Sequence, residues 1–232
     1  MKRFYTSAEA APAGAGAWQV QLDGRPVKTV GGRQQLVPTE ALARALAAEW
    51  ARQGETIDPA AFLYRDMTDY ALDVIAPDRA QAVAELLPYG ETDTLCYRAE
   101  PGDALRREQD LLWEPLLAAA EARHGLSFER IGGIIHRPQP AGTMASLERH
   151  LAALDPFTLA ALRNLAGLAA SLVVGLSVLD GQTAPEELWT AANLEEDWQA
   201  ERWGRDAEAA ARRAHRREVF LAAARFAALA RG

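Results

Sequence analysis

The alternation of apolar and polar residues near the start of the chain predicts a β-strand. Trp18, Val20 and Leu22 alternate with glutamines, and a period of two is typical of a half-buried strand. Asp23-Gly24 follows directly. This pair favours a two-residue hairpin turn because glycine accepts a positive φ.

Two further short strands complete the predicted sheet. They cover residues 27–30 and 35–37, and Gly31-Gly32 between them indicates a second tight turn. A three-stranded antiparallel meander of this size is not stable alone in water. We therefore expect another element to cover its apolar face.

A helix over residues 40–53 is the predicted cover. Thr39 is placed to cap its start. Leu42, Leu46 and Trp50 recur every four residues, which puts them on one helical stripe. That stripe is expected to pack on the sheet.

From about residue 60 onward the spacing of apolar residues is helical. The predicted helices cover residues 62–75, 78–87, 92–98, 103–124, 144–153, 156–179, 186–203 and 206–230. One exception is residues 127–136, where Ile131, Ile134 and Ile135 indicate a strand that is a candidate to join the N-terminal sheet. The pattern predicts an α+β protein with an α/β domain over residues 1–60 and a helical bundle over residues 61–232.

Composition and charge narrow the possible functions. The 232 residues are 49% hydrophobic and 25% charged, which is an ordinary globular balance. The net charge of −7 argues against a surface for nucleic acid, because phosphate binding needs clustered Lys and Arg. The one dense basic run, residues 212–217, is flanked by glutamates. The most apolar stretch, residues 165–179, is too short to cross a bilayer, so no direct membrane insertion is expected.

Motifs for catalysis or metal binding do not emerge from the sequence. Cys96 is a lone cysteine, and a small buried thiol is its expected role. The glycines of residues 14–16 precede a strand instead of following one, and the chain lacks a phosphate-binding loop. The four histidines are scattered without metal-ligand spacing. We therefore predict no catalytic residue, no metal and no cofactor.

The segment around residues 186–208 carries eight acidic residues against two arginines. On one continuous helix, Trp189, Glu196 and Trp203 would share a face, with Gln199 beside them, because steps of seven residues drift little around a helix. A carboxylate between two indoles is unusual for a core stripe. The spacing leaves open whether this face receives a partner or is a solvated acidic face with its indole edges tucked inward.

The sequence resembles a known family along nearly its whole length. The matching motifs are Arg3-Phe4-Tyr5, Leu22-Asp23-Gly24-Arg25-Pro26-Val27-Lys28-Thr29, Pro38-Thr39, Glu49-Trp50, Gln53, Ile57-Asp58-Pro59, Tyr89, Thr92-Asp93, Cys96-Tyr97-Arg98, Gln109, Trp113, Pro115-Leu116-Leu117, Glu195-Glu196, Gln199 and Trp203-Gly204. They resemble the assembly chaperones that bind the free alpha subunit of the ATP synthase catalytic head. The chain departs from the family at Phe62-Leu63, where Met-Pro is common, and at Asp69, where Asn is common.

The resemblance implies a fold and a function. The fold is an N-terminal α/β layer followed by a larger orthogonal helical bundle. The function is to hold the free alpha subunit, shield its apolar interface from aggregation and release it to the beta subunit, with no nucleotide of its own. Acidic residues of the Glu-Glu motif are implicated in this function. The candidate partner-binding residues are therefore Glu195, Glu196, Gln199, Trp203 and Trp189.

Several further expectations follow from the resemblance and from the start of the chain. The chain begins without an apolar leader or a mitochondrial presequence, so it is expected to be the cytoplasmic, bacterial form and a monomer when free. We expect it not to be an enzyme. The alternative is an unrelated acidic interaction module, or an enzyme with an unrecognised site.

Overall fold

The computed structural model describes residues 1–133, 135–204 and 206–232. The chain divides into two compact units. Unit 1 contains Met1–Arg79, Asp155–Ala161 and Ala222–Gly232, and unit 2 contains Ala80–Leu154 and Leu162–Leu221. Among the described residues, no helix is both long enough and apolar enough to cross a membrane.

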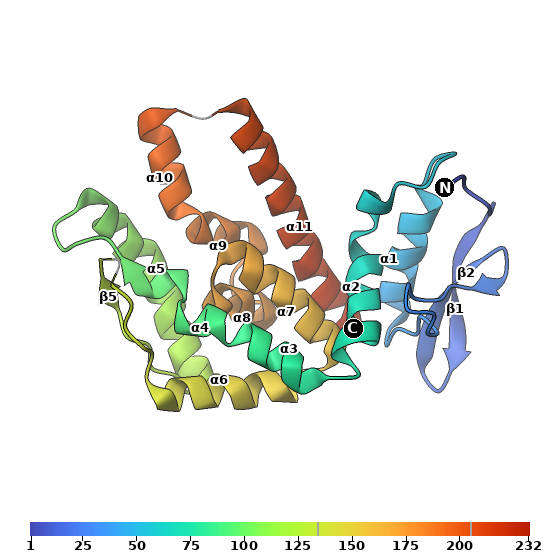
Figure 1. The fold of residues 1–232 in the computed structure, drawn as a ribbon, viewed down its shortest axis with the longest axis horizontal. Helices are drawn as coiled ribbons and strands as arrows, with labels where there is room; N and C mark the ends of the chain where they lie inside the picture. Colours follow the sequence, from blue (N-terminus) through green and yellow to red (C-terminus); the bar gives the residue numbers. More distant parts are fainter. Residues whose placement is uncertain (134, 205) are drawn as a thin grey trace. The chain divides into compact units, whose positions relative to one another are not determined.

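The elements combine a small sheet with many helices, which confirms the predicted α+β class (Figure 1). In order they are β1 (Ala8–Gly14), β2 (Ala17–Leu22), β3 (Arg25–Pro26), α1 (Glu40–Ala51), η1 (Pro59–Ala61), α2 (Leu63–Tyr70), η2 (Ala71–Ile75), α3 (Arg79–Leu86), α4 (Pro88–Glu91), η3 (Thr94–Cys96), β4 (Tyr97–Arg98), α5 (Ala104–His124), β5 (Ile131–Gly132), α6 (Ala141–Ala153), α7 (Pro156–Ala169), α8 (Leu172–Asp180), α9 (Pro185–Ala192), α10 (Leu194–Trp203) and α11 (Ala207–Arg231).

The sheet of unit 1 is antiparallel with the strand order β1-β2-β3. Asp23 and Gly24 form the predicted turn, and both have positive φ angles, 47° and 77°. The prediction missed β1, whose sequence of alanines with one proline gives no alternating signal. It also placed strands over residues 27–30 and 35–37, where only isolated bridges form, Lys28 to Gln34 and Trp18 to Val37.

Helix α1 packs on β1 and β2, as its apolar stripe predicted. Leu42, Leu46 and Trp50 are all buried. Thr39 caps the helix, and its hydroxyl accepts a hydrogen bond from the Leu42 amide at 3.1 Å. Burying each such side chain contributes about 1.5–3 kcal/mol, so this one face supplies much of the stability of the sheet.

Residues far along the chain complete the core of unit 1. Phe226 is fully buried. Its ring centroid lies 6.2 Å from that of Tyr64 and 6.4 Å from that of Phe157. The Thr39 hydroxyl donates to the Leu229 carbonyl at 2.5 Å. The division of the chain therefore differs from the boundary expected at residue 60.

Unit 2 is built around α5 and the helices packed against it. Trp113 of α5 is fully buried, and its indole Nε1 donates to the Ala191 carbonyl at 2.8 Å. The predicted strand over residues 127–136 is reduced to β5, which pairs in parallel with β4 and not with the N-terminal sheet. The expected pairing is therefore wrong. Ile134, which contributed to that prediction, lies outside the described residues.

The predicted helix over residues 156–179 is two helices. Ala170 has a φ of 48°, which ends α7, and Ser171 caps α8 by accepting a hydrogen bond from the Val174 amide at 3.0 Å. The apolar pattern continues through the break because both helices lie in the core. Periodicity alone could not detect it.

Asp93, a carboxylate without exposed surface, joins η3 to the start of α8. Its Oδ1 accepts from the Leu95 amide at 3.0 Å, and its Oδ2 accepts from the Val173 amide at 2.9 Å. The first amides of a helix have no partner within the helix, so a carboxylate placed there satisfies them. Burial raises the pKa of Asp93 to about 6 despite these hydrogen bonds.

Replacing Asp93 tests this connection. Asp93→Ala leaves two buried amides without acceptors and should cost about 2 kcal/mol at pH 7 in urea unfolding. The folded state holds the Asp93 proton more tightly than the unfolded state. The stability contributed by Asp93 therefore falls as pH rises from about 4 to 6, and the penalty of the variant should be larger at pH 4.

The matched control is Asp103→Ala. Asp103 caps α5 through the Leu105 amide at 2.8 Å but is exposed, so its loss should cost about 1 kcal/mol. Equal penalties for the two variants would contradict the role assigned to Asp93.

Candidate partner-binding site

The acidic segment is divided into two helices at Asn193. The Asn193 side chain donates to the Trp189 carbonyl at 2.8 Å, and its backbone amide also donates to that carbonyl, at 3.1 Å. Asn competes in this way for backbone acceptors and so terminates helices. Helix α9 ends before it, and α10 begins after it.

This break overturns the predicted stripe. Trp189, Glu196 and Trp203 do not share one face of a continuous helix. Trp189 is 2% exposed and packs on Phe220, with ring centroids 5.3 Å apart, whereas Trp203 is 78% exposed. Trp189 therefore supports the site from the core, and Trp203 belongs to its surface.

Arg213 of α11 connects the two helices that form the site. It lies opposite the first turn of α10, which carries Glu195, Glu196 and Asp197. Its Nη2 donates to Asp197 Oδ2 at 2.6 Å, and its side chain is only 14% exposed. Negative charge in the first turn also suits the helix dipole. The pair thus fixes α10 alongside α11.

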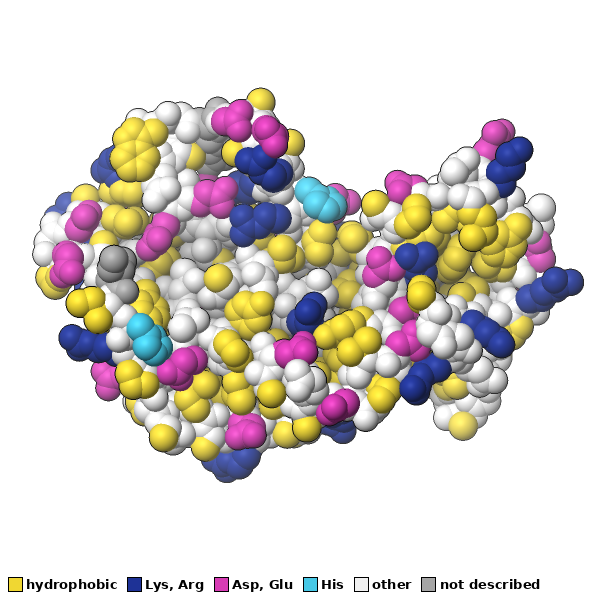
Figure 2. Space-filling view, viewed as in Figure 1, with side chains coloured by type: hydrophobic (Ala, Val, Ile, Leu, Met, Phe, Trp, Pro, Cys, Tyr) yellow, Lys and Arg dark blue, Asp and Glu magenta, His cyan; other side chains and the backbone are white. Residues whose placement is uncertain are grey.

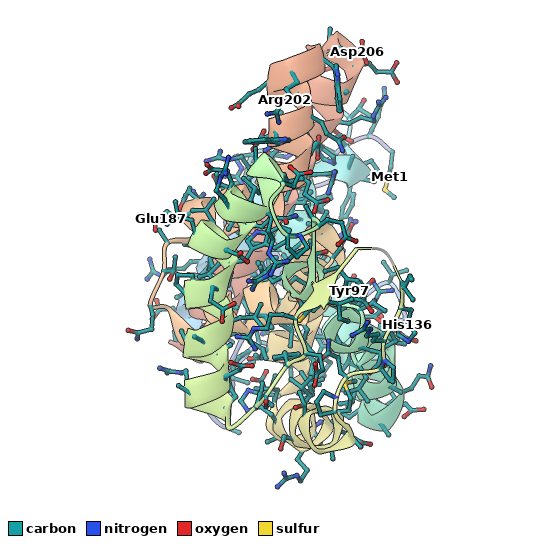
Figure 3. The ribbon with its side chains drawn as sticks, turned by 90° about the vertical axis from the view of Figure 1, so that its left-hand side faces the viewer. Met1, Tyr97, His136, Glu187, Arg202 and Asp206 are labelled. Carbon is teal, nitrogen blue, oxygen red and sulfur yellow. The ribbon has the colours of Figure 1, made fainter. Side chains whose placement is uncertain are left out.

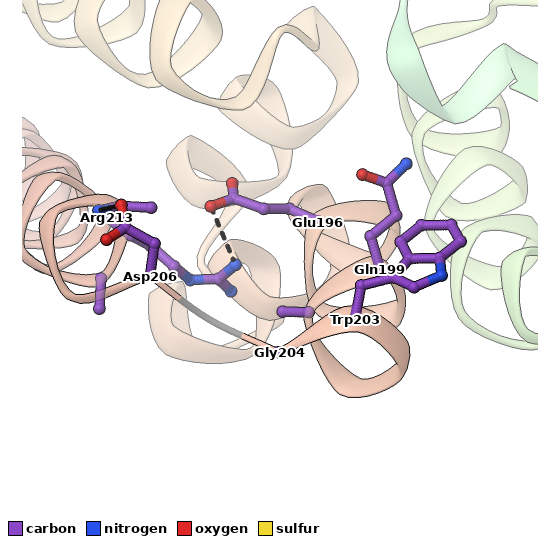
Figure 4. A pocket seen from close by; sticks show the side chains of 9 residues that line it. Glu196, Gln199, Trp203, Gly204, Asp206 and Arg213 are labelled. Atoms are coloured by element: carbon purple, nitrogen blue, oxygen red, sulfur yellow. Dashed lines mark hydrogen bonds and ion pairs between the residues drawn. The ribbon is translucent and has the colours of Figure 1, made fainter.

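Glu196 is half-exposed and shared between two cations. Its carboxylate oxygens lie 3.6 Å from Arg213 Nη1 (Figure 4) and 3.5 Å from Arg216 Nη1, and 44% of its side chain is exposed. Arg216 also lies over the Trp189 ring at 5.7 Å. In Figure 2, acidic and basic side chains lie close together between α10 and α11. Glu196 is therefore paired and still accessible.

A pocket of about 310 Å³ lies beside Glu196. It is lined by Glu196, Gln199, Ala200, Trp203, Gly204, Asp206, Ala209, Ala210 and Arg213. Gly204 ends α10 with φ 85° and ψ 167°, a conformation that only glycine adopts readily. The Trp203-Gly204 pair thus places an exposed indole at the point where the helix stops.

Glu195 faces a different hollow from Glu196. Consecutive residues on a helix point about 100° apart. The Glu195 carboxylate accepts from Gln109 Nε2 at 2.6 Å, and Gln109 Oε1 in turn accepts from the Ala99 amide at 2.8 Å. Burial raises the pKa of Glu195, and the hydrogen bond from Gln109 lowers it less. The two motif glutamates therefore have separate surroundings.

The sequence reasoning missed the basic partners of this site. The arginine run over residues 212–217 served only to argue against nucleic acid, yet Arg213 and Arg216 are three residues apart and face the acidic helix. Their spacing beside an acidic segment was the available signal. Gln109 was recognised only as a family residue, because its pairing with Glu195 spans 86 positions.

The chemistry available at the site is recognition by charge and aromatic surface. Within the described part of the chain, no group of three or more His, Cys, Asp or Glu side chains could hold a metal ion. Cys96 is buried, and burial raises the pKa of its thiol well above the usual range, so it is a poor nucleophile. An exposed indole beside a partly open carboxylate is typical of a protein-binding surface.

Comparisons with known proteins identify the family of this chain. The sequence model of the ATP12 chaperone protein family matches residues 2–121. Paracoccus denitrificans Atp12 is 38% identical, with a TM-score of 0.92 over 99% of this chain and 98% of that one. A point mutant of the Paracoccus protein gives the same identity and TM-score. The mitochondrial protein atp12 of Schizosaccharomyces pombe is 27% identical over 197 residues, 80% of this chain and 68% of that protein.

These matches define the class of protein. The protein is an assembly chaperone with an α+β fold and not an unrelated acidic module. The chain belongs to the ATP12 chaperone family, whose members serve ATP synthase assembly.

The Arg213 connection can be tested by removing its guanidinium. Arg213→Ala leaves Asp197 and Glu196 without their shared cation and should lower the free energy of unfolding by about 1–3 kcal/mol. Arg212→Ala is the matched control, since Arg212 is exposed and pairs with Glu208 on its own helix. It should cost no more than about 0.5 kcal/mol. Urea unfolding at low and high salt measures both, and equal penalties would refute the special role of Arg213.

Proposed function

We propose that this chaperone binds the free alpha subunit of ATP synthase through the surface formed by α10 and the start of α11. The surface consists of Glu196, Gln199 and Trp203, with Glu195 on the adjacent side of α10. It covers apolar surface of the alpha subunit that otherwise drives aggregation, and it releases the subunit to beta. This function requires no nucleotide, metal or catalytic residue.

One observation carries the proposal. Trp203 is 78% exposed beside a half-exposed carboxylate, in a chain of the ATP12 family. Burial of an indole on binding supplies apolar contact area, and a nearby charge supplies orientation and specificity. The Arg213 and Arg216 ion pairs hold the Glu196 carboxylate in place before the partner arrives, which lowers the entropic cost of binding.

A capture experiment tests the identity of the partner. The tagged chain is incubated with bacterial lysate that contains alpha subunit not yet assembled with beta. The proposal expects free alpha subunit as the chief captured protein, and added beta subunit should displace it. Recovery of unrelated proteins with no enrichment of alpha would contradict the proposed partner.

Reversing the charge of Glu196 tests the surface itself. Glu196→Lys removes two half-exposed ion pairs and places a third cation beside Arg213 and Arg216, so stability should fall by only about 1–2 kcal/mol. Binding of a cationic partner group should weaken by several kcal/mol, and protection of the alpha subunit in light scattering should be lost.

Glu201→Lys is the matched control for this variant. Glu201 is exposed on the same helix and lies outside the pocket lining. It makes the same change in net charge and should retain protection. A folded Glu196→Lys variant that protects as well as Glu201→Lys would remove Glu196 from the site.

A further inference from the structure

A second hollow of unit 2 contains Glu195 and has a cavity volume of about 570 Å³. It is lined by Thr92, Thr94, Tyr97, Arg98, Ala99, Leu105, Gly133, His136 and Glu195, and we refer to it as the Glu195 groove. Clefts of roughly 300–1,000 Å³ hold drug-sized ligands, so the groove has room for a long side chain. Figure 3 shows Tyr97 and His136 close together, and the Tyr97 hydroxyl lies 3.0 Å from His136 Nδ1.

Glu195 lacks a cationic partner among the described residues. Its one polar contact there is the hydrogen bond from Gln109, which is neutral and already holds the Ala99 amide. Glu196, the next residue, lies between two arginines. A half-buried carboxylate without a counter-ion is energetically unfavourable, and a cation that enters the groove would relieve this cost.

The cations near the groove are already paired with carboxylates. Arg98 is buried and committed to two carboxylates, with Asp110 at 2.6 Å and Glu114 at 2.8 Å. His136 is exposed and lies 4.0 Å from Glu91. Arg106 also pairs with Asp110, and Arg130 also pairs with Glu114, so these cations and carboxylates balance one another and the charge of Glu195 is left over. Leu105 and the Tyr97 ring provide apolar surface.

We propose that the Glu195 groove receives one lysine or arginine side chain of the client protein. The alkyl part of that side chain lies along Leu105 and Tyr97, and its charged end pairs with Glu195. Long basic side chains combine an apolar stem with a charged head, which matches both features of the groove. This inference rests on the proposed function, and it gives the two motif glutamates different roles.

The test uses Glu195→Gln in the full chain. The amide oxygen of glutamine still accepts from Gln109, so the fold should be retained, as checked by urea unfolding. The concentration of chaperone needed to protect the alpha subunit should rise about tenfold, because a charge-assisted contact is lost. The matched control is Glu187→Gln, since Glu187 is exposed on α9 and lies away from Tyr97 and His136 in Figure 3.

A second measurement detects binding of a small probe to the Glu195 groove in the absence of a client protein. N-acetylarginine amide is added to the wild-type protein, and the His136 ring signals are followed by NMR. The probe should shift these signals. The uncharged analogue N-acetylcitrulline amide should not shift them, and Glu195→Gln should abolish the response to the arginine probe.

The two measurements separate the possible failures. Equal shifts with both probes, or full client protection by Glu195→Gln, would overturn the groove proposal even if Glu196→Lys abolishes protection. If the wild-type protein fails to protect the alpha subunit, the proposed function is wrong. The probe experiment then still decides whether the groove selects a basic side chain.

Discussion

The backbone amides at the starts of helices impose the main constraint on this structure, and buried carboxylates satisfy them from a distance. Asp93 accepts the Val173 amide at the start of α8, 80 positions further along the chain. In unit 1, the buried Glu49 accepts the amides of Tyr64 and Arg65 at 2.7 and 2.9 Å, which anchors α2 to α1. Each contact caps a helix and also joins two segments that are distant in the sequence. Each also holds a carboxylate whose pKa is raised by burial.

Paired and unpaired carboxylates also divide the proposed partner-binding site. Arg213 neutralises Asp197 and contributes to Glu196, so ion pairs hold that side of α10 in place before a partner arrives. On the other side, Glu195 is held by a neutral amide and its charge remains uncompensated among the described residues. A chaperone must bind its client protein and later release it. We regard the Arg213 pairs as the source of rigidity on one side, where the half-exposed Glu196 still faces the partner, and Glu195 as a second point of affinity for a cationic group.

The sequence predicted those features that depend on local spacing. The stripe of α1, the turn at Asp23 and the fold class followed from periodicity and turn chemistry, and the family followed from motifs in register. The break at Asn193 was missed because one side chain that competes for backbone carbonyls leaves the apolar pattern unchanged. The partner of Glu195 was missed because Gln109 is distant in sequence, and β1 was missed because alanines carry no alternation.

Residues 222–232 belong to unit 1, and this has a consequence for folding during synthesis on the ribosome. The core around Tyr64 is finished by Phe157 and Phe226, so the N-terminal layer emerges from the ribosome long before its last aromatic partner is made. At about 5–20 residues per second, that interval lasts on the order of ten seconds or more. During this time the part of the unit 1 core that packs against Phe226 remains uncovered in the nascent chain. The core of unit 1 can therefore be completed only after residues 222–232 have been made.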